Sequence, residues 1–192
     1  MRKLKLQVQI SIDGYIAGPN GELDWLQWNW DQVLKDYIKE ITDPVDCIVL
    51  GRKLAEGFIP YWADVADNPA HPEYEAGLKF TETRKVVFTK TLNKLIGNNT
   101  VLAKEDLVSE INNLKNQEGQ DIIAYGGSNF VSALIKARLI DEFHFLVNPT
   151  AIGKGMPIFN ELEKKEDFTL QNAIGFQCGI VVLNYILKNT NL

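Results

Sequence analysis

Two adjacent glycines, Gly126 and Gly127, end a run of apolar residues and precede Ser128 and Asn129. Glycine lets the backbone adopt dihedral angles that other residues avoid, and it lets a ligand approach closely. The apolar run before the pair is typical of a buried strand, and the spacing after it, from Phe130 on, indicates a helix. A helix N-terminus binds anions such as phosphate, whereas Ser128 or Asn129 could instead cap the helix. The pair alone also fits a tight turn without a ligand.

Basic and hydroxyl residues follow two other predicted strands. Gly51 is followed by Arg52 and Lys53 at a strand-to-helix turn, and Thr89 and Lys90 follow another apolar run. Because ligands of open α/β sheets bind at the carboxyl ends of the strands, we expect these turns near the glycine pair. Guanidinium and ammonium groups suit phosphate. The combination predicts a phosphorylated dinucleotide, with its pyrophosphate on the glycines and a 2′-phosphate bound by Arg52, Thr89 and Lys90.

Hydride transfer from such a dinucleotide to a C=N bond needs a proton donor, usually a carboxylic acid with a raised pKa. The candidates are Asp13, Asp24 and Asp31. Asp24 is favoured because Trp25 follows it, and an apolar neighbour raises the pKa of a buried carboxyl group. The alternative for Asp24 is an ordinary turn residue, and Asp13 is expected to shape an Asp-Gly turn. Tyr125, before the glycines, is expected to line the pocket of the dinucleotide.

Short apolar strands alternate with helical patterns along the chain. Residues Leu4 to Ile12 alternate as a strand, and helical spacing indicates a helix at about Trp28 to Thr42. A short helix follows Gly51, and the polar, proline-containing stretch from Asp64 to Glu82 predicts an excursion over the surface. Two late strand patterns predict an antiparallel hairpin without a standard two-residue turn. We expect one α/β domain, residues 1–192, with helices on both faces of a mixed, mostly parallel sheet.

The composition bounds the class of protein. The 192 residues are 45% hydrophobic and carry a net charge of -5, which indicates one ordinary core and argues against nucleic acid as the main partner. The two cysteines lie in apolar runs and the two histidines are far apart, so we expect no disulfide and no metal site. No signal peptide or membrane span is apparent, so we expect a cytoplasmic protein, no membrane partner and a small-molecule substrate.

The order of the motifs resembles the dihydrofolate reductase superfamily, and within it the reductase domain of the bacterial bifunctional riboflavin-pathway deaminase-reductase. The segments SIDGYIAGPNGELDW, VLGRKLAEGF, VVFTKTL and IIAYGGSNF follow one another as in that family. The resemblance implies a three-layer α/β/α fold with about eight strands, NADPH as hydride donor and a homodimer. It implies an activity similar to 5-amino-6-(5-phosphoribosylamino)uracil reductase. The alternatives are dihydrofolate reduction and, in another class, a non-catalytic nucleotide-binding protein.

The resemblance also implies roles for residues. It places the pyrophosphate on the turn from Gly126 to Phe130 and the 2′-phosphate on Arg52, Thr89 and Lys90. It places the nicotinamide carboxamide on backbone groups of Gln9 and Ile16. Ala17 would pack nearby.

Two positions depart from the family pattern. Leu54 stands where the family usually has a threonine that caps the helix and touches phosphate. Gln7 and Gln9 stand in the first strand, which in the folate enzyme is apolar or small where it faces the pterin. The glutamines favour a substrate other than dihydrofolate.

Overall fold

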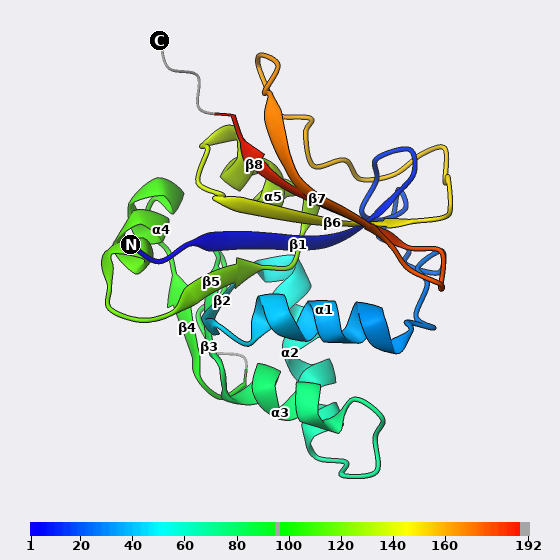
Figure 1. The fold of residues 1–192 in the computed structure, drawn as a ribbon. Helices are drawn as coiled ribbons and strands as arrows, with labels where there is room; N and C mark the ends of the chain where they lie inside the picture. Colours follow the sequence, from blue (N-terminus) through cyan, green and yellow to red (C-terminus); the bar gives the residue numbers. More distant parts are fainter. Residues whose placement is uncertain (95–96, 189–192) are drawn as a thin grey trace.

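A computed structural model describes residues 1–94 and 97–188 of the protein. Within these residues, eight strands form one sheet in the order β4-β3-β2-β5-β1-β6-β8-β7 (Figure 1). The strands are β1 (Leu4–Ser11), β2 (Val45–Gly51), β3 (Arg84–Phe88), β4 (Thr100–Ala103), β5 (Asp121–Ala124), β6 (Glu142–Asn148), β7 (Phe168–Gly175) and β8 (Val181–Leu187). The helices are α1 (Gln32–Thr42), α2 (Arg52–Ala66), α3 (Tyr74–Glu82), α4 (Leu107–Asn116) and α5 (Ser128–Lys136).

The sheet is mixed and mostly parallel, as the sequence predicts. The six strands from β4 to β6 run parallel to one another, and β8 and β7 add an antiparallel hairpin. The hairpin turn is closed by the N–H group of Phe176, which donates to Ile180 O at 2.9 Å, with Gly179 at φ +92°. This longer turn explains why no two-residue turn signal is present.

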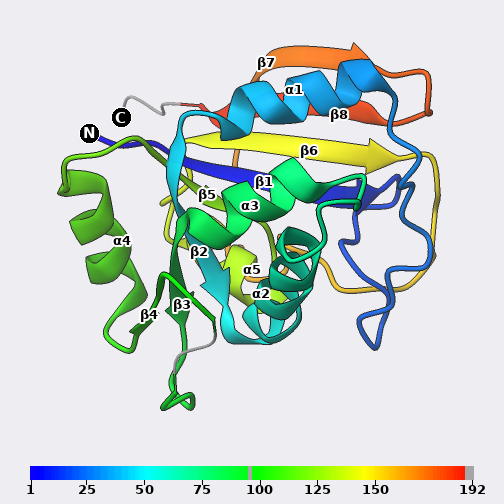
Figure 2. The same cartoon turned by 90° about the horizontal axis from the view of Figure 1, so that it is seen from below.

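Helices cover both faces of the sheet, which gives three layers (Figures 1 and 2). On one face, α4 and α5 pack on the central strands, where Leu6 meets Val131 in the main core. On the other face, Ile59 of α2 packs with Leu50, and Leu34 of α1 packs on β6 and β8. The predicted α/β/α architecture is therefore confirmed.

The first helix begins later than the sequence pattern suggests. α1 begins at Gln32 instead of Trp28, because Asp31 is its N-cap and accepts the N–H group of Leu34 at 2.9 Å. Trp28 instead stacks on Trp30 in the preceding loop, with 6.2 Å between ring centroids. The helical spacing of apolar residues holds from Val33 to Ile41, and the cap at Asp31 determines where the helix begins.

The expected surface excursion at Asp64 to Glu82 is wrong. α2 continues to Ala66 with Pro60 in its interior, and α3 then packs against it. A Cβ atom on Gly77 would lie 2.8 Å from Ala66 N, so this glycine permits the close approach of the two helices. The rings of Phe58 and Phe80 meet at 5.3 Å between the helices and the sheet. Burial of these aromatic groups offsets the hydrogen bond that Pro60 removes.

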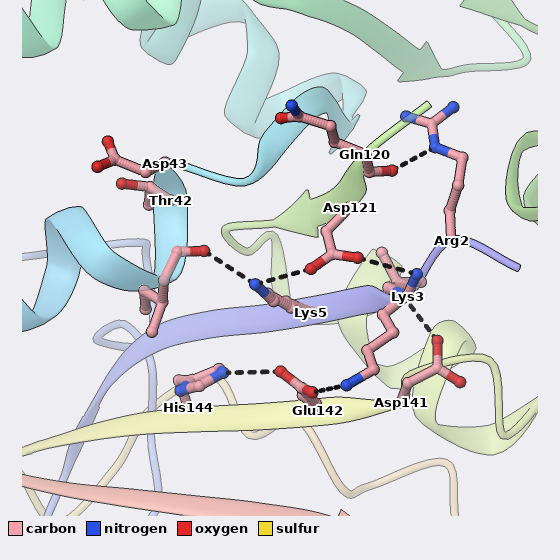
Figure 3. A network of polar contacts seen from close by, with 12 residues as sticks. Arg2, Lys3, Lys5, Thr42, Asp43, Gln120, Asp121, Asp141, Glu142 and His144 are labelled. Atoms are coloured by element: carbon pink, nitrogen blue, oxygen red, sulfur yellow. Dashed lines mark hydrogen bonds and ion pairs between the residues drawn. The ribbon is translucent and has the colours of Figure 1, made fainter. Parts of the chain in front are cut away.

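Ion pairs cross the edge of the sheet where β1, β2, β5 and β6 begin, which we call the amino edge (Figure 3). The guanidinium group of buried Arg2 pairs with Asp46 and donates to Gln120 O at 2.6 Å. Lys5 Nζ lies 2.9 Å from Asp121 Oδ2. Lys115 Nζ, which is not labelled in Figure 3, lies 2.6 Å from an oxygen of Asp141. These pairs join segments at this edge that are far apart in the sequence.

Candidate functional site

The predicted site residues gather at the opposite edge, where the parallel strands end, which we call the carboxyl edge. The loops that follow β1 and β6 lie side by side there in both overall views (Figures 1 and 2). The N–H group of Ile12 donates to Thr150 O at 2.9 Å, and that of Ile16 donates to Met156 O at 3.0 Å. The turns that follow β2, β3 and β5 end at the same edge because those strands are parallel to β1.

The glycine pair adopts a backbone that only glycine adopts readily. Gly126 has φ +146° and Gly127 has φ +85°, and Gly127 is the N-cap of α5. No side chain caps this helix. The prediction that Ser128 or Asn129 provides a cap is wrong, because the Ser128 hydroxyl group donates to Pro157 O instead. The N–H groups of the first turn of α5 therefore remain available to an anion.

α2 begins in the same way at the neighbouring strand. Gly51 is its N-cap, again without a side-chain cap. A Cβ atom on Gly51 would lie 2.8 Å from Phe130 Cβ, so the close approach of α5 requires glycine at this position. Leu54 lies against the glycine pair, with Cδ2 3.7 Å from a Cβ atom built on Gly126. The side chain that replaces the family's threonine thus adds apolar contact beside the anion site.

Two other helices differ from this pair. Asp31 caps α1, and Asp106 caps α4 by accepting the N–H group of Ser109 at 2.9 Å. A carboxylate in such a cap occupies the positions that an anion would take. The N–H groups in the first turns of α2 and α5 are therefore free to bind a phosphate, whereas those of α1 and α4 already bind a carboxylate.

The residues predicted to bind phosphate lie beside these first turns and differ in burial and in their hydrogen-bond partners. Arg52 is half-buried and its Nη1 lies 2.8 Å from Glu56 Oε1, whereas Lys53 and Lys90 are exposed. Thr89 is buried, and its Oγ1 accepts the N–H groups of two following residues, at 3.1 and 2.9 Å. Because Oγ1 accepts these bonds, the hydroxyl proton of Thr89 is left to donate to a phosphate oxygen.

Tyr125 lies on a different face from the glycine turn. Its ring stacks on Phe58 at 5.5 Å and meets the edge of Phe80 at 5.5 Å, within the cluster under α2 and α3. Burial raises the pKa of the Tyr125 hydroxyl group above its usual value. Its position supports the turn after β5 from the α2 side of the sheet.

The sheet opens between β1 and β5 at the carboxyl edge. β5 pairs with β1 only from Leu4 to Leu6, whereas β6 pairs with β1 up to Ser11. Beyond Leu6, the backbone of β1 that includes Gln9 therefore has a strand neighbour on one side alone in the described part of the sheet. A flat ring with a carboxamide group can bind to such an open strand edge.

The Ile16 and Ala17 backbone is partly engaged near this opening. The Ile16 N–H group donates to Met156 O at 3.0 Å, and Ala17 O accepts the Met156 N–H group at 2.8 Å. Ala17 is buried, and a Cβ atom on Gly155 would lie 2.3 Å from Ala17 O. The carbonyl group of Ile16 is the group of this residue that remains for a ligand.

The three candidate acids have distinct surroundings. The Asp13 carboxylate accepts from Ser11 Oγ at 2.7 Å and from Gly153 N at 2.6 Å, and the Ser11 bond first of all lowers its pKa. Asp13 therefore joins the loops after β1 and β6, in addition to shaping its turn. Asp31 is the helix cap already described. Asp24 is exposed beside half-buried Trp25, so its carboxyl group is open to solvent.

Sequence reasoning missed the role of Asn148, which is fully buried at the end of β6. Its Oδ1 accepts the N–H group of Gln27 at 2.8 Å, and its Nδ2 donates to Gln9 Oε1 at 3.1 Å. Asn148 thus connects the loop before α1 to the first strand. The sequence signal that could have revealed this role is a polar residue, Gln9, on a central strand, together with an asparagine at the end of the strand that pairs with it.

One cavity lies away from the carboxyl edge. It has a volume of about 110 Å³ and lies between α2, α3 and β3, beside Phe58, Trp62 and Lys85. Lys85 Nζ donates there to three carbonyl groups, and burial lowers its pKa to about 8. Its ammonium group is satisfied by the end of α3. Among the described residues, no helix could cross a membrane and no cluster of three metal-binding side chains is found.

The three-layer architecture and the glycine turn at the carboxyl edge define a dihydrofolate-reductase-like fold. More narrowly, the chain belongs to the RibD C-terminal domain family, whose sequence model matches residues 2–182. The uncharacterized protein YyaP of Bacillus subtilis is 30% identical over 186 residues, which cover 96% of this chain and 94% of that protein. The uncharacterized protein YwjB of the same organism is 27% identical, over 96% of this chain and 98% of that protein.

Solved structures show the same fold at lower identity. A putative riboflavin biosynthesis protein from Shewanella sp. PV-4 has a TM-score of 0.71 and 23% identity, over 98% of this chain and all of that chain. A diaminohydroxyphosphoribosylaminopyrimidine deaminase/5-amino-6-(5-phosphoribosylamino)uracil reductase from Thermotoga maritima has a TM-score of 0.69 and 18% identity, over 97% of this chain. The match covers 57% of the Thermotoga chain. This family of RibD-like reductases indicates an oxidoreductase.

Proposed function

We propose that the protein is an NADPH-dependent reductase of a small heterocyclic or imine substrate, similar to 5-amino-6-(5-phosphoribosylamino)uracil reductase. One observation carries the proposal: two uncapped helix N-termini, at Gly51 and Gly127, meet at the carboxyl edge beside Arg52 and Thr89. Membership of the RibD C-terminal domain family supports it. The positive φ angles of the glycine pair fit a cradle for a pyrophosphate, because no Cβ atom intrudes there.

The first turn of α5, from Gly127 to Phe130, would hold the pyrophosphate through its N–H groups. The Thr89 hydroxyl group, with Arg52, Lys53 and Lys90, would hold the 2′-phosphate. When bound, NADPH supplies a hydride from nicotinamide C4. The open edge of β1, through the backbone of Gln9 and the carbonyl group of Ile16, would orient the carboxamide group so that C4 faces the substrate.

Arg52 is suited to exchange one anionic partner for another. Its ion pair with Glu56 is between side chains that are 37% and 44% exposed, and such a pair contributes little to stability. A phosphate group offers the guanidinium two parallel hydrogen bonds and a larger charge. Binding of the 2′-phosphate would therefore displace Glu56 at small cost.

Reduction of a C=N bond adds the hydride to carbon and a proton to nitrogen. We propose that Asp24 gives this proton, directly or through water, since it follows the open edge of β1 in the loop before α1. Because Asp24 is exposed, the substrate itself must exclude water from the carboxyl group. A non-catalytic nucleotide-binding protein is the second candidate function, and the exposure of Asp24 is the observation that favours it.

The test is a titration of intrinsic tryptophan fluorescence with NADPH and, separately, NADH. Arg52→Ala should weaken NADPH binding by about 10- to 100-fold, the effect of losing a charge-assisted hydrogen bond, and should leave NADH binding nearly unchanged. Lys39→Ala is the matched control, because Lys39 and Asp43 form an exposed pair with the same i,i+4 spacing on α1. If the protein binds neither NADPH nor NADH, the proposed reductase function is overturned. Binding without turnover of pyrimidine or folate substrates by the wild type would favour the second candidate.

A further inference from the structure

A buried polar atom lies without a partner on the face of the sheet that α1 and α2 cover. Within the part of the chain that the structure describes, Gln7 Oε1 is the buried side-chain oxygen or nitrogen atom with no hydrogen bond. Gln7 is 9% exposed. An unpaired amide oxygen in such a position destabilises the fold, so a retained one points to a ligand.

The position of Gln7 places this atom beside the open part of the sheet. Gln7 directly follows Leu6, the last residue of β1 that pairs with β5. On one side its partner in register is His144 of β6. On the other side, Lys5 pairs with Ile123, so the next residue with this orientation is Tyr125, directly after the end of β5. The amide group of Gln7 therefore lies between the α1 side and the α2 side of the same face.

Two polar neighbours of Gln7, Lys5 and His144, have partners of their own (Figure 3). Lys5 Nζ donates to Ile41 O at 3.2 Å and pairs with Asp121 at 2.9 Å. His144 Nδ1 lies 2.8 Å from the hydroxyl group of Tyr37, which is not labelled in Figure 3. Since these groups are satisfied, they leave Gln7 to a molecule from outside the chain.

Gln9 lies two residues along the same face, and its amide group is oriented by Asn148. The backbone N–H group of Gln27 can only donate, so the atom of Asn148 that it contacts is the oxygen. The Asn148 nitrogen then donates to Leu146 O at 3.1 Å and to Gln9 Oε1 at 3.1 Å. The remaining group of the Gln9 amide is consequently the NH₂ donor, on a half-buried side chain.

We propose that Gln7 and Gln9 form a binding site for a neutral ligand whose edge carries an N–H donor beside a carbonyl acceptor. Gln9 Nε2 would donate to the ligand carbonyl oxygen, and Gln7 Oε1 would accept from the ligand N–H group. Both residues are uncharged, and Lys5 is engaged, so the site favours an amide or ureide edge over a carboxylate or phosphate. Asn148 is the positioning residue that fixes the direction of the Gln9 donor.

This inference rests on the proposed reductase, because both molecules of that reaction could supply such an edge. One source is the carboxamide group of the nicotinamide. The other is a cyclic amide in the heterocyclic substrate. The two sources present the same donor and acceptor atoms, and separate probes distinguish them.

The test follows the side-chain amide signals of Gln9 in ¹⁵N–¹H correlation spectra, assigned with Gln9→Met. Uracil and nicotinamide are added separately as the two probes, and 1,3-dimethyluracil, which keeps both carbonyl groups but has no N–H group, is the control. At least one probe should shift the Gln9 signals, Gln7→Met should weaken its binding about 5- to 10-fold, and dimethyluracil should bind at least as weakly to the wild type. A shift by uracil alone assigns the site to the substrate, and a shift by nicotinamide alone assigns it to the dinucleotide.

Three results would overturn the inference: no shift with either probe, equal binding of dimethyluracil and uracil where uracil binds, or unchanged binding of the probe in Gln7→Met. Thermal unfolding provides an independent reading, because removal of the unpaired oxygen in Gln7→Met should raise the Tm by about 2–4 °C. A lower Tm would show that the Gln7 amide is satisfied inside the fold, and would also overturn it. Binding of 2′,5′-ADP, weakened by Arg52→Ala, reports on the phosphate site alone, so failure of the amide site and failure of the proposed function give different results.

Discussion

The two edges of the sheet differ in how their polar groups are satisfied. At the amino edge, Arg2, Lys3, Lys5 and Lys115 each pair with a carboxylate from another element. At the carboxyl edge, glycines with positive φ angles precede α5, and the first turns of α2 and α5 have no side-chain cap. The parallel strands thus begin at a set of ion pairs and end beside helix N–H groups that are free to donate hydrogen bonds.

The difference between the two edges indicates that the amino edge contributes to stability and the carboxyl edge to ligand binding. Charges at the amino edge hold the ends of the strands in register, since each bridges segments that are distant in the sequence. The carboxyl edge has glycines at positive φ and helix N–H groups without a side-chain cap, which are typical of ligand sites. A substitution at one edge should therefore affect one property and spare the other.

The largest loss of stability is expected from Arg2→Met at the amino edge. The side chain is 7% exposed, and its loss would leave Asp46 without its partner and Gln120 O without its donor. We expect about 3 kcal/mol less stability in urea unfolding, with NADPH affinity unchanged. Arg84→Met is the control, because Arg84 begins β3 at the same edge but is exposed, and its change should stay within about 0.5 kcal/mol. Weaker NADPH binding by folded Arg2→Met would show that the edges are coupled.

Gly126→Ala should mainly lower NADPH affinity at the carboxyl edge, with a smaller cost in stability. At φ +146° an alanine is strained by about 1–3 kcal/mol, although its Cβ would have ordinary contact with Leu54. A backbone that relaxes away from this angle would lower NADPH affinity more than tenfold, measured by fluorescence titration. Gly57→Ala, inside α2 with open space for a Cβ atom, should instead gain about 0.5–1 kcal/mol and keep its affinity. Full affinity in Gly126→Ala would argue against the pyrophosphate cradle.

Acid should weaken the amino edge in a defined pH range. Interaction with His144 first, and then with Lys3, lowers the pKa of the Glu142 carboxyl group from 4.5 to about 2. His144 Nε2 is 3.6 Å away, long for a hydrogen bond, whereas Lys3 Nζ is at 2.7 Å, so the geometry favours Lys3 as the stronger partner. Because the folded state holds the carboxylate, its contribution is complete above pH 4.5 and disappears as the pH falls towards 2.

The measurement is thermal unfolding of the wild type and Glu142→Gln between pH 2 and 6. The stability difference between them should be about 1–2 kcal/mol near pH 6 and should shrink below pH 4.5. Glu163→Gln, which removes an exposed pair with Lys136, should change the profile little. A difference that stays constant with pH would mean that Glu142 acts through packing instead of charge.

Much of the fold could be predicted because the alternation of strand and helix patterns is local. The six parallel strands each appear as a short apolar or alternating run, and the glycine turns mark their ends. The segment from Asp64 to Glu82 was misjudged because α3 is stabilised by packing on α2 through Gly77, which no local pattern reveals. The start of α1 was misplaced because it is determined by the cap at Asp31, a side-chain hydrogen bond that the spacing of apolar residues does not indicate.

The candidate site was predictable where one residue type determines the backbone. Gly126 and Gly127 identify their turn by themselves, and parallel strands bring Arg52 and Thr89 to the same edge. The roles of Gln7 and Asn148 could not be predicted, because they depend on hydrogen bonds made or missing across about 140 residues of sequence. Whether these predicted residues bind NADPH is what the proposed titrations decide.

The central position of β1 has a consequence for how the chain is made. β1 leaves the ribosome well before its neighbours β5 and β6, which begin at Asp121 and Glu142. At about 5–20 residues per second, translation leaves β1 without either neighbour for on the order of ten seconds. During that time its apolar residues are exposed in the nascent protein, and Lys5, Gln7 and Gln9, which alternate with them, make it a poorer template for aggregation.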